Sequence, residues 1–204
     1  MTNQEPQSGL YSSPFCAGYW REAKLSVKNL RLLVLAALLV AGRVAITSFY
    51  VMVGENLKIS FGFFLNALGS LIYGPFVGIL TGFATDILGT IIHPIGPFFP
   101  GYTLTAMAGS FVYALFFYRA RITVRRVVLC KLCVNLFVNV GLNCLWSAIL
   151  YSKGYFYYLA KSLAKNLVML PIEVVILLAF LRLMLPIVAR AGLVPPQPTK
   201  HIPF

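Results

Sequence analysis

Arg43 has the clearest chemical potential in this sequence, because it lies deep inside a long apolar stretch. The stretch covers residues 30–50, and Arg43 lies about 13 residues, or roughly 20 Å, from its beginning at about 1.5 Å per residue. A charge at such depth costs about 2.5–3.5 kcal/mol on insertion scales and usually faces a partner or a cavity. We therefore expect Arg43 either to bind an anionic ligand or to pair with Asp86 or Glu173, the acids inside other apolar stretches.

Asp86 follows a row of glycines. Gly74, Gly78 and Gly82 precede it at successive four-residue steps, and a face of small residues lets another helix approach closely. Helix packing is the interpretation we favour for the three glycines. Asp86 leaves its helix near that face, so we expect it to point into the protein, where it accepts hydrogen bonds from a ligand or steadies Arg43.

A polar stripe marks a later apolar stretch. Asn135, Asn139 and Asn143 are spaced four residues apart, and Trp146 follows three residues after them. Amides offer paired donors and acceptors that suit a flat heterocycle, and an indole can stack on such a ring. Interhelical hydrogen bonding is the alternative for the asparagines, and a position at the membrane interface is the alternative for Trp146.

A stiff loop covers residues 93–101, which include three prolines and two glycines. Proline cannot continue a helix, and it lowers the entropy cost of holding a binding loop in place. We favour a ligand lid over a passive turn here, with the start of the next helix contributing to it. Our candidate ligand contacts in this region and around an earlier polar loop are Lys58, Phe61, Phe98, Tyr102 and Thr103.

The composition indicates a membrane protein. The 204 residues are 59% hydrophobic and only 11% charged, whereas soluble domains carry about 25% charged residues. The formal charge of +12 would suggest nucleic acid in a soluble protein. Here the cations cluster at the ends of apolar stretches, as topology signals and contacts with lipid headgroups do. We expect contact with membrane lipid and no nucleic-acid partner.

The sequence contains no motif of a known catalytic or cofactor site. It has no G-x-x-x-x-G-K-[ST] segment for ATP, no H-E-x-x-H and no G-x-S-x-G. Cys130 and Cys133 form a C-x-x-C pair, but His93 and His201 lie far from it, and a structural zinc site needs four ligands. We therefore predict neither an enzyme nor a cofactor or metal site.

Six apolar stretches predict an all-α membrane protein, a bundle of six transmembrane helices. A span needs roughly 20 apolar residues, and Gly74-Pro75 separates the second stretch from the third because proline interrupts helical hydrogen bonding. An aromatic, lysine-bearing loop is expected at residues 151–165. The predicted spans are residues 30–50, 61–73, 76–92, 102–118, 127–150 and 166–188.

The distribution of Lys and Arg predicts the orientation. Cations gather before the first span, at Arg21, Lys24 and Lys28, and in the connection between the fourth and fifth spans. Since cytoplasmic loops carry the excess of cations, both termini should be cytoplasmic. The irregular loops then face outward and suggest a ligand site that opens outside. The predicted organisation is a cytoplasmic tail at 1–29, a transmembrane substrate-binding domain at 30–189 and a cytoplasmic tail at 190–204.

Four segments of the chain resemble the S components of energy-coupling factor (ECF) transporters, specifically the folate family. The strongest are ISFGFFLNALGSLIYGPFVGILTGFATDILGT, FFPGYTLTAMAGSFVYALFFY, LNCLWSAILY and AKNLVMLPIEV. The middle of this resemblance is shared with S components for other vitamins. The segments around Trp146 and Leu170-Pro171 favour folate.

This resemblance implies a protein of the bacterial cell membrane that captures folate or a related vitamin from outside. A separate transmembrane T component and two cytoplasmic ATPases would drive delivery, during which the S component tips over in the membrane. In this family an alanine motif on the first helix docks onto the T component. Ala37 and Ala41 match the motif, although Gly42 replaces a bulkier residue.

The resemblance also suggests how folate would be held. Arg43 or the outer lysines would meet the two carboxylates of its glutamate. The pterin would contact Asn139, Asn143, Trp146 and Phe61.

Three alternatives stay open. The first is an S component for another vitamin, such as pantothenate. A stand-alone secondary transporter would move its substrate without ATPases. A membrane-embedded enzyme or proton relay would need Asp86, His93 and Glu173 around a water-filled cavity.

Overall fold

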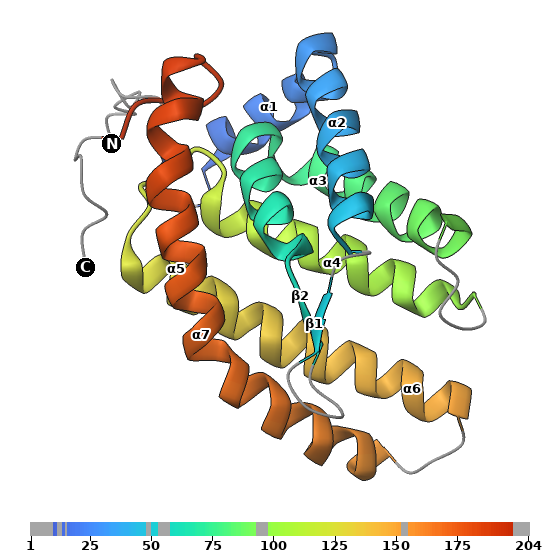
Figure 1. Cartoon of the computed structure of the whole chain (residues 1–204). Coiled ribbons are helices and arrows are strands. Elements are labelled where there is room, and N and C mark those ends of the chain that lie inside the picture. Colours follow the sequence, from blue (N-terminus) through green and yellow to red (C-terminus); the bar gives the residue numbers. More distant parts are fainter. Residues whose placement is uncertain are drawn as a thin grey trace.

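The computed structural model describes residues 10–11, 14, 16–47, 50–52, 58–92, 98–151 and 155–197. Helices dominate this part of the chain, and a short antiparallel hairpin, β1–β2, extends from one end of the bundle (Figure 1). The elements are α1 (Ala17–Ser26), α2 (Leu30–Thr47), β1 (Tyr50–Met52), β2 (Lys58–Ser60), α3 (Gly62–Ile92), α4 (Pro100–Phe117), α5 (Val124–Cys133), the π-helix η1 (Val134–Leu142), α6 (Asn143–Tyr151) and α7 (Tyr155–Arg190).

The helices have the length and composition of membrane spans. In the described residues, four helical stretches are long and apolar enough to cross a membrane. Many large apolar side chains on them are exposed, including Leu30 at 73% and Phe137 at 70%, as expected where lipid covers the surface. The four stretches are Leu30–Thr47, Gly62–Ile92, Val124–Leu150 and Ser162–Arg190. The predicted helical membrane fold is confirmed at this level.

A break in the middle of α3 turns the chain. Gly74 has a φ of 78° and a ψ of −171°, far from helical values, and Pro75 follows it. A Cβ atom at Gly74 would also lie 3.0 Å from the ring of Tyr118, so both the backbone angle and the close approach require glycine. The break predicted at Gly74-Pro75 is therefore present, and the two halves of α3 point in different directions (Figure 1).

The second half of α3 packs closely against α4. A Cβ atom at Gly82 would lie 2.7 Å from the carbonyl oxygen of Ala106, and one at Gly78 would lie 3.5 Å from that of Ser110. Glycine at these two positions lets the backbones approach, as small residues do in membrane bundles. The packing function that we favoured for the glycine row is therefore present at Gly78 and Gly82, whereas Gly74 forms the break in α3.

One apolar core joins the first half of α3 to α4, α5, η1 and α7. Its fully buried members include Ala67, Phe117, Val127, Leu177 and Leu181. This core fills the end of the bundle from which both termini leave. Polar side chains gather around the cavity at the opposite end of the same helices.

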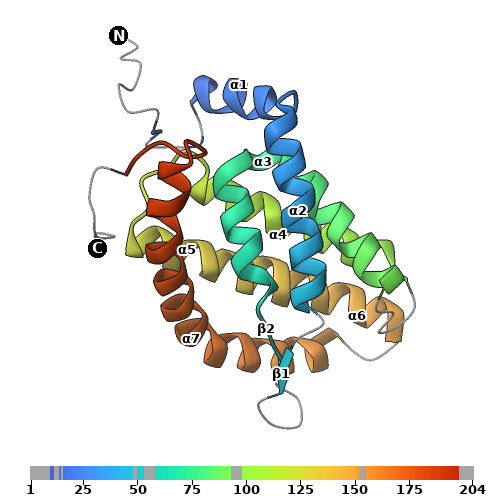
Figure 2. The same ribbon diagram turned by 45° about the horizontal axis from the view of Figure 1, so that its top comes forward.

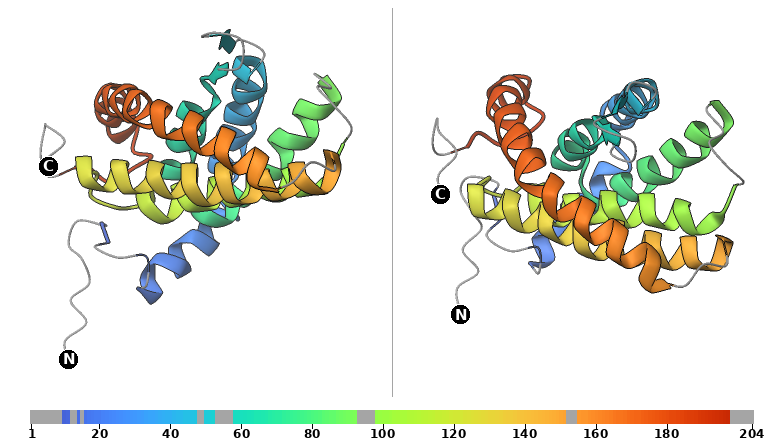
Figure 3. Two further views of the ribbon diagram at one scale, coloured as in Figure 1. Left: turned by 90° about the horizontal axis from the view of Figure 1, so that it is seen from below. Right: turned by 60° about the horizontal axis from the view of Figure 1, so that its bottom comes forward.

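Two long rods complete the bundle. Helices α5, η1 and α6 run as one continuous rod beside α7 (Figure 3). Helix α7 contains Pro171 and Pro186, and it curves along its length (Figure 2), as expected for a helix that proline interrupts. The loop predicted at residues 151–165 was wrong for most of its length, because α7 already begins at Tyr155.

The segment before the first span was expected as a tail and contains a helix that was not predicted. Helix α1 lies across the end of the bundle (Figure 2). The hydroxyl of Tyr19, which is buried, donates to the carbonyl of Ala114 at 3.0 Å. Burial raises the pKa of Tyr19 above its ordinary value, so the hydroxyl keeps its proton for this bond. The other end of the chain meets the same place, where the Gln197 side chain bonds Ala120 and Ile122.

Candidate functional site

A cavity of about 810 Å³ opens among α2, α3, α4, α5, η1, α6 and α7. Its size lies within the range of ligand sites, about 300–1,000 Å³. Among the described residues that line it, three cations face two carboxylates, which leaves a formal charge of +1. They are Arg43, Lys131, Lys165, Asp86 and Glu173. A cavity with an excess of positive charge favours an anionic ligand.

Neutral groups hold Arg43 in this cavity. Its Nη1 donates to Asn66 Oδ1 at 3.1 Å and lies 3.5 Å from Ser110 Oγ. The Ser110 hydroxyl donates to the same Asn66 oxygen at 2.8 Å. In the part of the chain that the structure describes, Arg43 forms no ion pair with a carboxylate. A guanidinium has five N–H donors, so most of those of Arg43 remain available to a ligand.

Glu173 pairs with Lys131 instead of Arg43. Glu173 Oε2 lies 2.9 Å from Lys131 Nζ, and it accepts a hydrogen bond from Asn135 at 3.0 Å. Asn139 continues this chain of polar groups by donating to Asn135 Oδ1 at 3.2 Å. The Lys131 ammonium also lies 4.3 Å from the ring centroid of Phe63. This charged network forms one end of the cavity.

Asp86 is fixed by a neighbour on α4. The Thr103 hydroxyl donates to Asp86 Oδ2 at 2.7 Å, and Thr103 is itself buried. Asp86 lines the cavity, so its carboxylate is oriented by Thr103 and can accept hydrogen bonds from a ligand. Among the two functions expected for Asp86, the direct support of Arg43 is not present in this structure.

Aromatic side chains form the wall beside Asp86. Phe98, Phe99 and Tyr102 line the cavity, and Trp146 packs behind Phe99 with ring centroids 5.8 Å apart. The Trp146 indole donates to Thr105 Oγ1 at 3.1 Å. A Cβ atom at the neighbouring Gly101 would lie 2.5 Å from the Trp146 ring. Glycine there lets the indole approach the start of α4.

The three asparagines along η1 and the start of α6 have different surroundings. A π-helix such as η1 recurs at functional sites. Asn135 is fully buried, whereas Asn139 and Asn143 line the cavity. The predicted stripe therefore divides into one structural asparagine and two that face the ligand space.

The structure brings most of the predicted site residues together. Arg43, Asp86, Phe98, Tyr102, Asn139 and Asn143 line the cavity. Thr103 and Trp146 lie behind that lining. Phe61 stacks on Phe64, with ring centroids 6.0 Å apart, outside the lining. The side chain of Lys58 and all of His93 lie outside the described residues.

Several lining residues were not predicted, and one of them had a signal. Lys131 lies within the predicted fifth span, so like Arg43 it is a charge inside an apolar stretch. It also lies inside the Cys130–Cys133 pair, which was interpreted without it. The lining residues Asn66 and Tyr113 carry no signal in a single sequence, because ordinary polar residues are common in packed helices. Tyr113 is buried, and its hydroxyl has no hydrogen-bond partner among the described residues.

The fold and the cavity together define a helical membrane protein that binds a small molecule. The family model for the substrate-specific component of ECF transporters matches residues 31–181. The chain therefore belongs to this family.

Individual relatives agree with this family. The chain is 30% identical over 151 residues to the folate transporter FolT of Clostridium novyi strain NT, covering 74% of this chain and 88% of that protein. It is 35% identical over 130 residues to FolT of Leuconostoc mesenteroides, covering 60% and 70%. A crystal structure of FolT bound with folic acid matches with a TM-score of 0.64 at 30% identity, covering 72% of this chain and 88% of that one.

These matches confirm the predicted resemblance to folate-family S components. The family consists of substrate-binding components of transporters, so the chain is a multi-pass protein of the cell membrane and not an enzyme. The family match begins at residue 31, so α1 precedes it.

The Lys131–Glu173 pair provides a test of the cavity's electrostatics. Lys131→Met should lower the midpoint of thermal unfolding in detergent by several degrees, because removing one partner leaves a carboxylate largely buried and uncompensated. Glu173→Gln in addition should restore much of the loss, since the double variant carries no unpaired charge. A double variant that loses as much as the two single variants together would contradict this coupling.

Proposed function

We propose that this chain is the folate-binding S component of an ECF importer. It takes folate from outside the cell and delivers it through a shared T component with two ATPases. The observation that carries the proposal is Arg43, a cation inside the bundle without a carboxylate partner among the described residues. The relatives, which are folate transporters of two bacteria, supply the ligand.

The glutamate part of folate suits the cationic groups of the cavity. It carries two carboxylates, and Arg43 and Lys165 both line the cavity without an ion pair in the described structure. Charge-assisted hydrogen bonds to a carboxylate are about twice as strong as neutral ones. We assign one carboxylate to each cation.

The pterin part of folate suits the amide, carboxylate and aromatic groups of the cavity. It is flat, and its amino group and ring nitrogens offer donors beside acceptors. Asp86 can accept from the amino group, Asn139 and Asn143 can bond the ring edge, and Phe99 and Tyr102 can stack on its face. Trp146 then supports the stacking wall from behind and does not contact the ring.

The proposal includes six spans and two cytoplasmic termini. The spans are α2, the two halves of α3, α4, the rod from α5 to α6, and α7. Support comes from α1, the α4–α5 connection and the chain after α7, which meet at one end of the bundle. That end carries Arg21, Lys24, Arg119, Arg121 and Arg125, as the cytoplasmic side of a membrane protein does.

We place the docking surface for the T component on α2. Ala37 and Ala41 are both exposed there, next to the exposed side chains of Val34 and Leu38. Small residues on an exposed helix face let a partner helix approach closely.

Tryptophan fluorescence tests folate binding, because the chain has only two tryptophans. Trp146 packs directly behind the cavity wall, whereas Trp20 lies on α1 and packs on Phe76 of α3. Titrating the purified protein with folate should give a saturable change in emission. Trp20→Phe should keep this change, and Trp146→Phe should abolish it while calorimetry still detects binding.

Two results would count against this assignment. If pantothenate or another vitamin saturates the signal and folate does not, the chain is an S component for that vitamin. If folate quenches equally after Trp146→Phe, the ligand does not lie in this cavity.

Transport in vesicles tests the partnership. Ala41→Trp should reduce folate uptake into vesicles that also contain the T component and ATPases by about tenfold or more, because an indole prevents close helix approach. Folate affinity in detergent should stay unchanged. The matched control is Val175→Trp on α7, a 66% exposed position, which should retain uptake. Uptake by vesicles that contain this chain alone would instead identify a stand-alone transporter.

A further inference from the structure

A second, smaller cavity lies at the end of the bundle where α1, α2, the α4–α5 connection and the chain after α7 meet. Its volume is about 160 Å³, which leaves room for several waters and hence for a phosphate group with its five heavy atoms. Its walls include Ser26 and Asn29 before the family match, and Gly192, Leu193 and Pro195 after it. This cavity is separate from the one around Arg43.

Arg31 supplies one cation to this cavity. The residue is exposed, and its Nη2 donates to the carbonyl of Ala191 at 3.2 Å. Asn29 accepts from the Arg31 backbone N–H at 3.1 Å and so caps the start of α2. The single bond to Ala191 leaves most of the guanidinium donors of Arg31 free. The positive end of the α2 dipole adds to the charge of Arg31 at this place.

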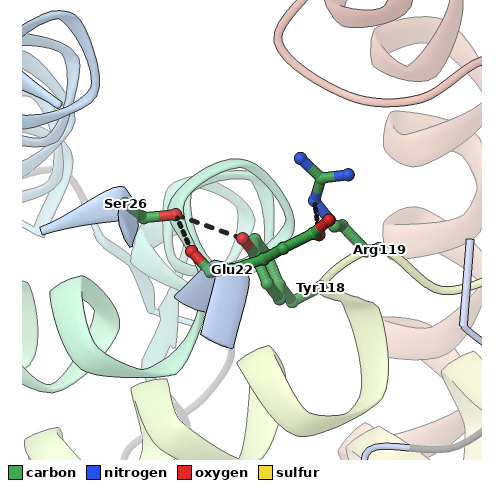
Figure 4. Close-up of polar contacts among 4 residues, drawn as sticks. All are labelled: Glu22, Ser26, Tyr118 and Arg119. Carbon is green, nitrogen blue, oxygen red and sulfur yellow. Dashed lines mark hydrogen bonds and ion pairs between the residues drawn. The ribbon is translucent and has the colours of Figure 1, made fainter. Parts of the chain in front are cut away.

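Arg119, in the α4–α5 connection, supplies a second cation to the same cavity. Its Nε lies 2.8 Å from Glu22 Oε2, and its two terminal nitrogens point away from that carboxylate (Figure 4). Arg119 has a positive φ of 45°, and its carbonyl accepts from the Tyr11 N–H at 2.7 Å. The backbone is therefore held in place, and the terminal nitrogens of Arg119 form no hydrogen bond to the described residues.

The two hydroxyl groups that line the cavity are bonded to each other. The Ser26 hydroxyl donates to the carbonyl of Glu22 at 3.2 Å, so in its 3.1 Å contact with Ser26 the Tyr118 hydroxyl is the donor (Figure 4). No acidic side chain is among the described lining residues, and Glu22 is occupied by Arg119. The charged donors that this cavity leaves free are therefore two guanidinium groups.

We propose that this cavity binds a phosphate group, either of an anionic phospholipid or of a free phosphate ion. Guanidinium forks match phosphate oxygens in pairs, and basic pockets between membrane helices bind phospholipid headgroups. Leu30 and Val34, which are 73% and 63% exposed, continue the surface of α2 beside Arg31. An acyl chain can lie along them while its phosphate occupies the cavity.

Thermal unfolding of the purified protein in a neutral detergent tests this proposal. Short-chain phosphatidylglycerol and inorganic phosphate are titrated separately, with phosphatidylcholine and chloride at equal ionic strength as controls. Phosphatidylglycerol, phosphate or both should raise the unfolding midpoint in a saturable way. Arg31→Gln should raise the half-saturating concentration by about tenfold or more, as expected for a lost charge-assisted hydrogen bond. Arg119→Lys, which keeps a charge for Glu22 but loses the guanidinium fork, should have a similar effect.

The matched control is Arg125→Gln, an exposed cation at the same end of the bundle that does not line the cavity. It removes the same charge and should leave the half-saturating concentration unchanged. Saturation by phosphatidylglycerol alone identifies a lipid as the source, and saturation by phosphate alone identifies the free ion. No saturable shift, or equal effects of Arg31→Gln and Arg125→Gln, would overturn the proposal. Folate binding serves as the folding control, and the two sites can fail independently.

Discussion

The cationic charge of Arg43 inside a lipid-embedded bundle is the constraint on which the rest of the site depends. The usual solution is an ion pair within the protein, and the described structure does not use it. Asn66 and Ser110 orient the guanidinium through neutral acceptors. Glu173 on α7 forms its ion pair with Lys131 and not with Arg43. The protein therefore keeps one positive charge uncompensated at the place where an anionic ligand can enter.

The packing of α3 creates the space around that charge. The turn at Gly74 sends the two halves of α3 in different directions, so that one half presents Asn66 and the other presents Asp86 to the same cavity. Gly82 lets the second half lie against the α4 backbone, which brings Thr103 within hydrogen-bond distance of Asp86. Apolar packing fills one end of these helices and polar groups line the other, so the fold and the site come from the same contacts.

Strong local signals made much of this predictable from sequence. Three of these signals can be recognised from the local sequence alone. The apolar stretches correspond to long helices, Gly74-Pro75 corresponds to the break in α3, and Arg43 lies in the lining of the cavity. What failed depended on tertiary contacts. Packing against the other helices buries Asn135 and leaves Asn139 and Asn143 in the cavity lining, and no spacing rule shows this. Helix α1 has too few apolar residues to be predicted from its own sequence, and it depends on the α4 surface that it covers.

Calorimetry with folate and with 6-hydroxymethylpterin, which keeps the pterin but has no carboxylate, tests the central claim that Arg43 binds the anionic end of the ligand. Arg43→Gln should weaken folate binding by about tenfold or more, as expected for a lost bond between charged groups, and should change binding of the pterin by less than about threefold. Arg125→Gln, far from the cavity lining, should change neither. Equal weakening of both ligands by Arg43→Gln, or no weakening of either, would contradict the account.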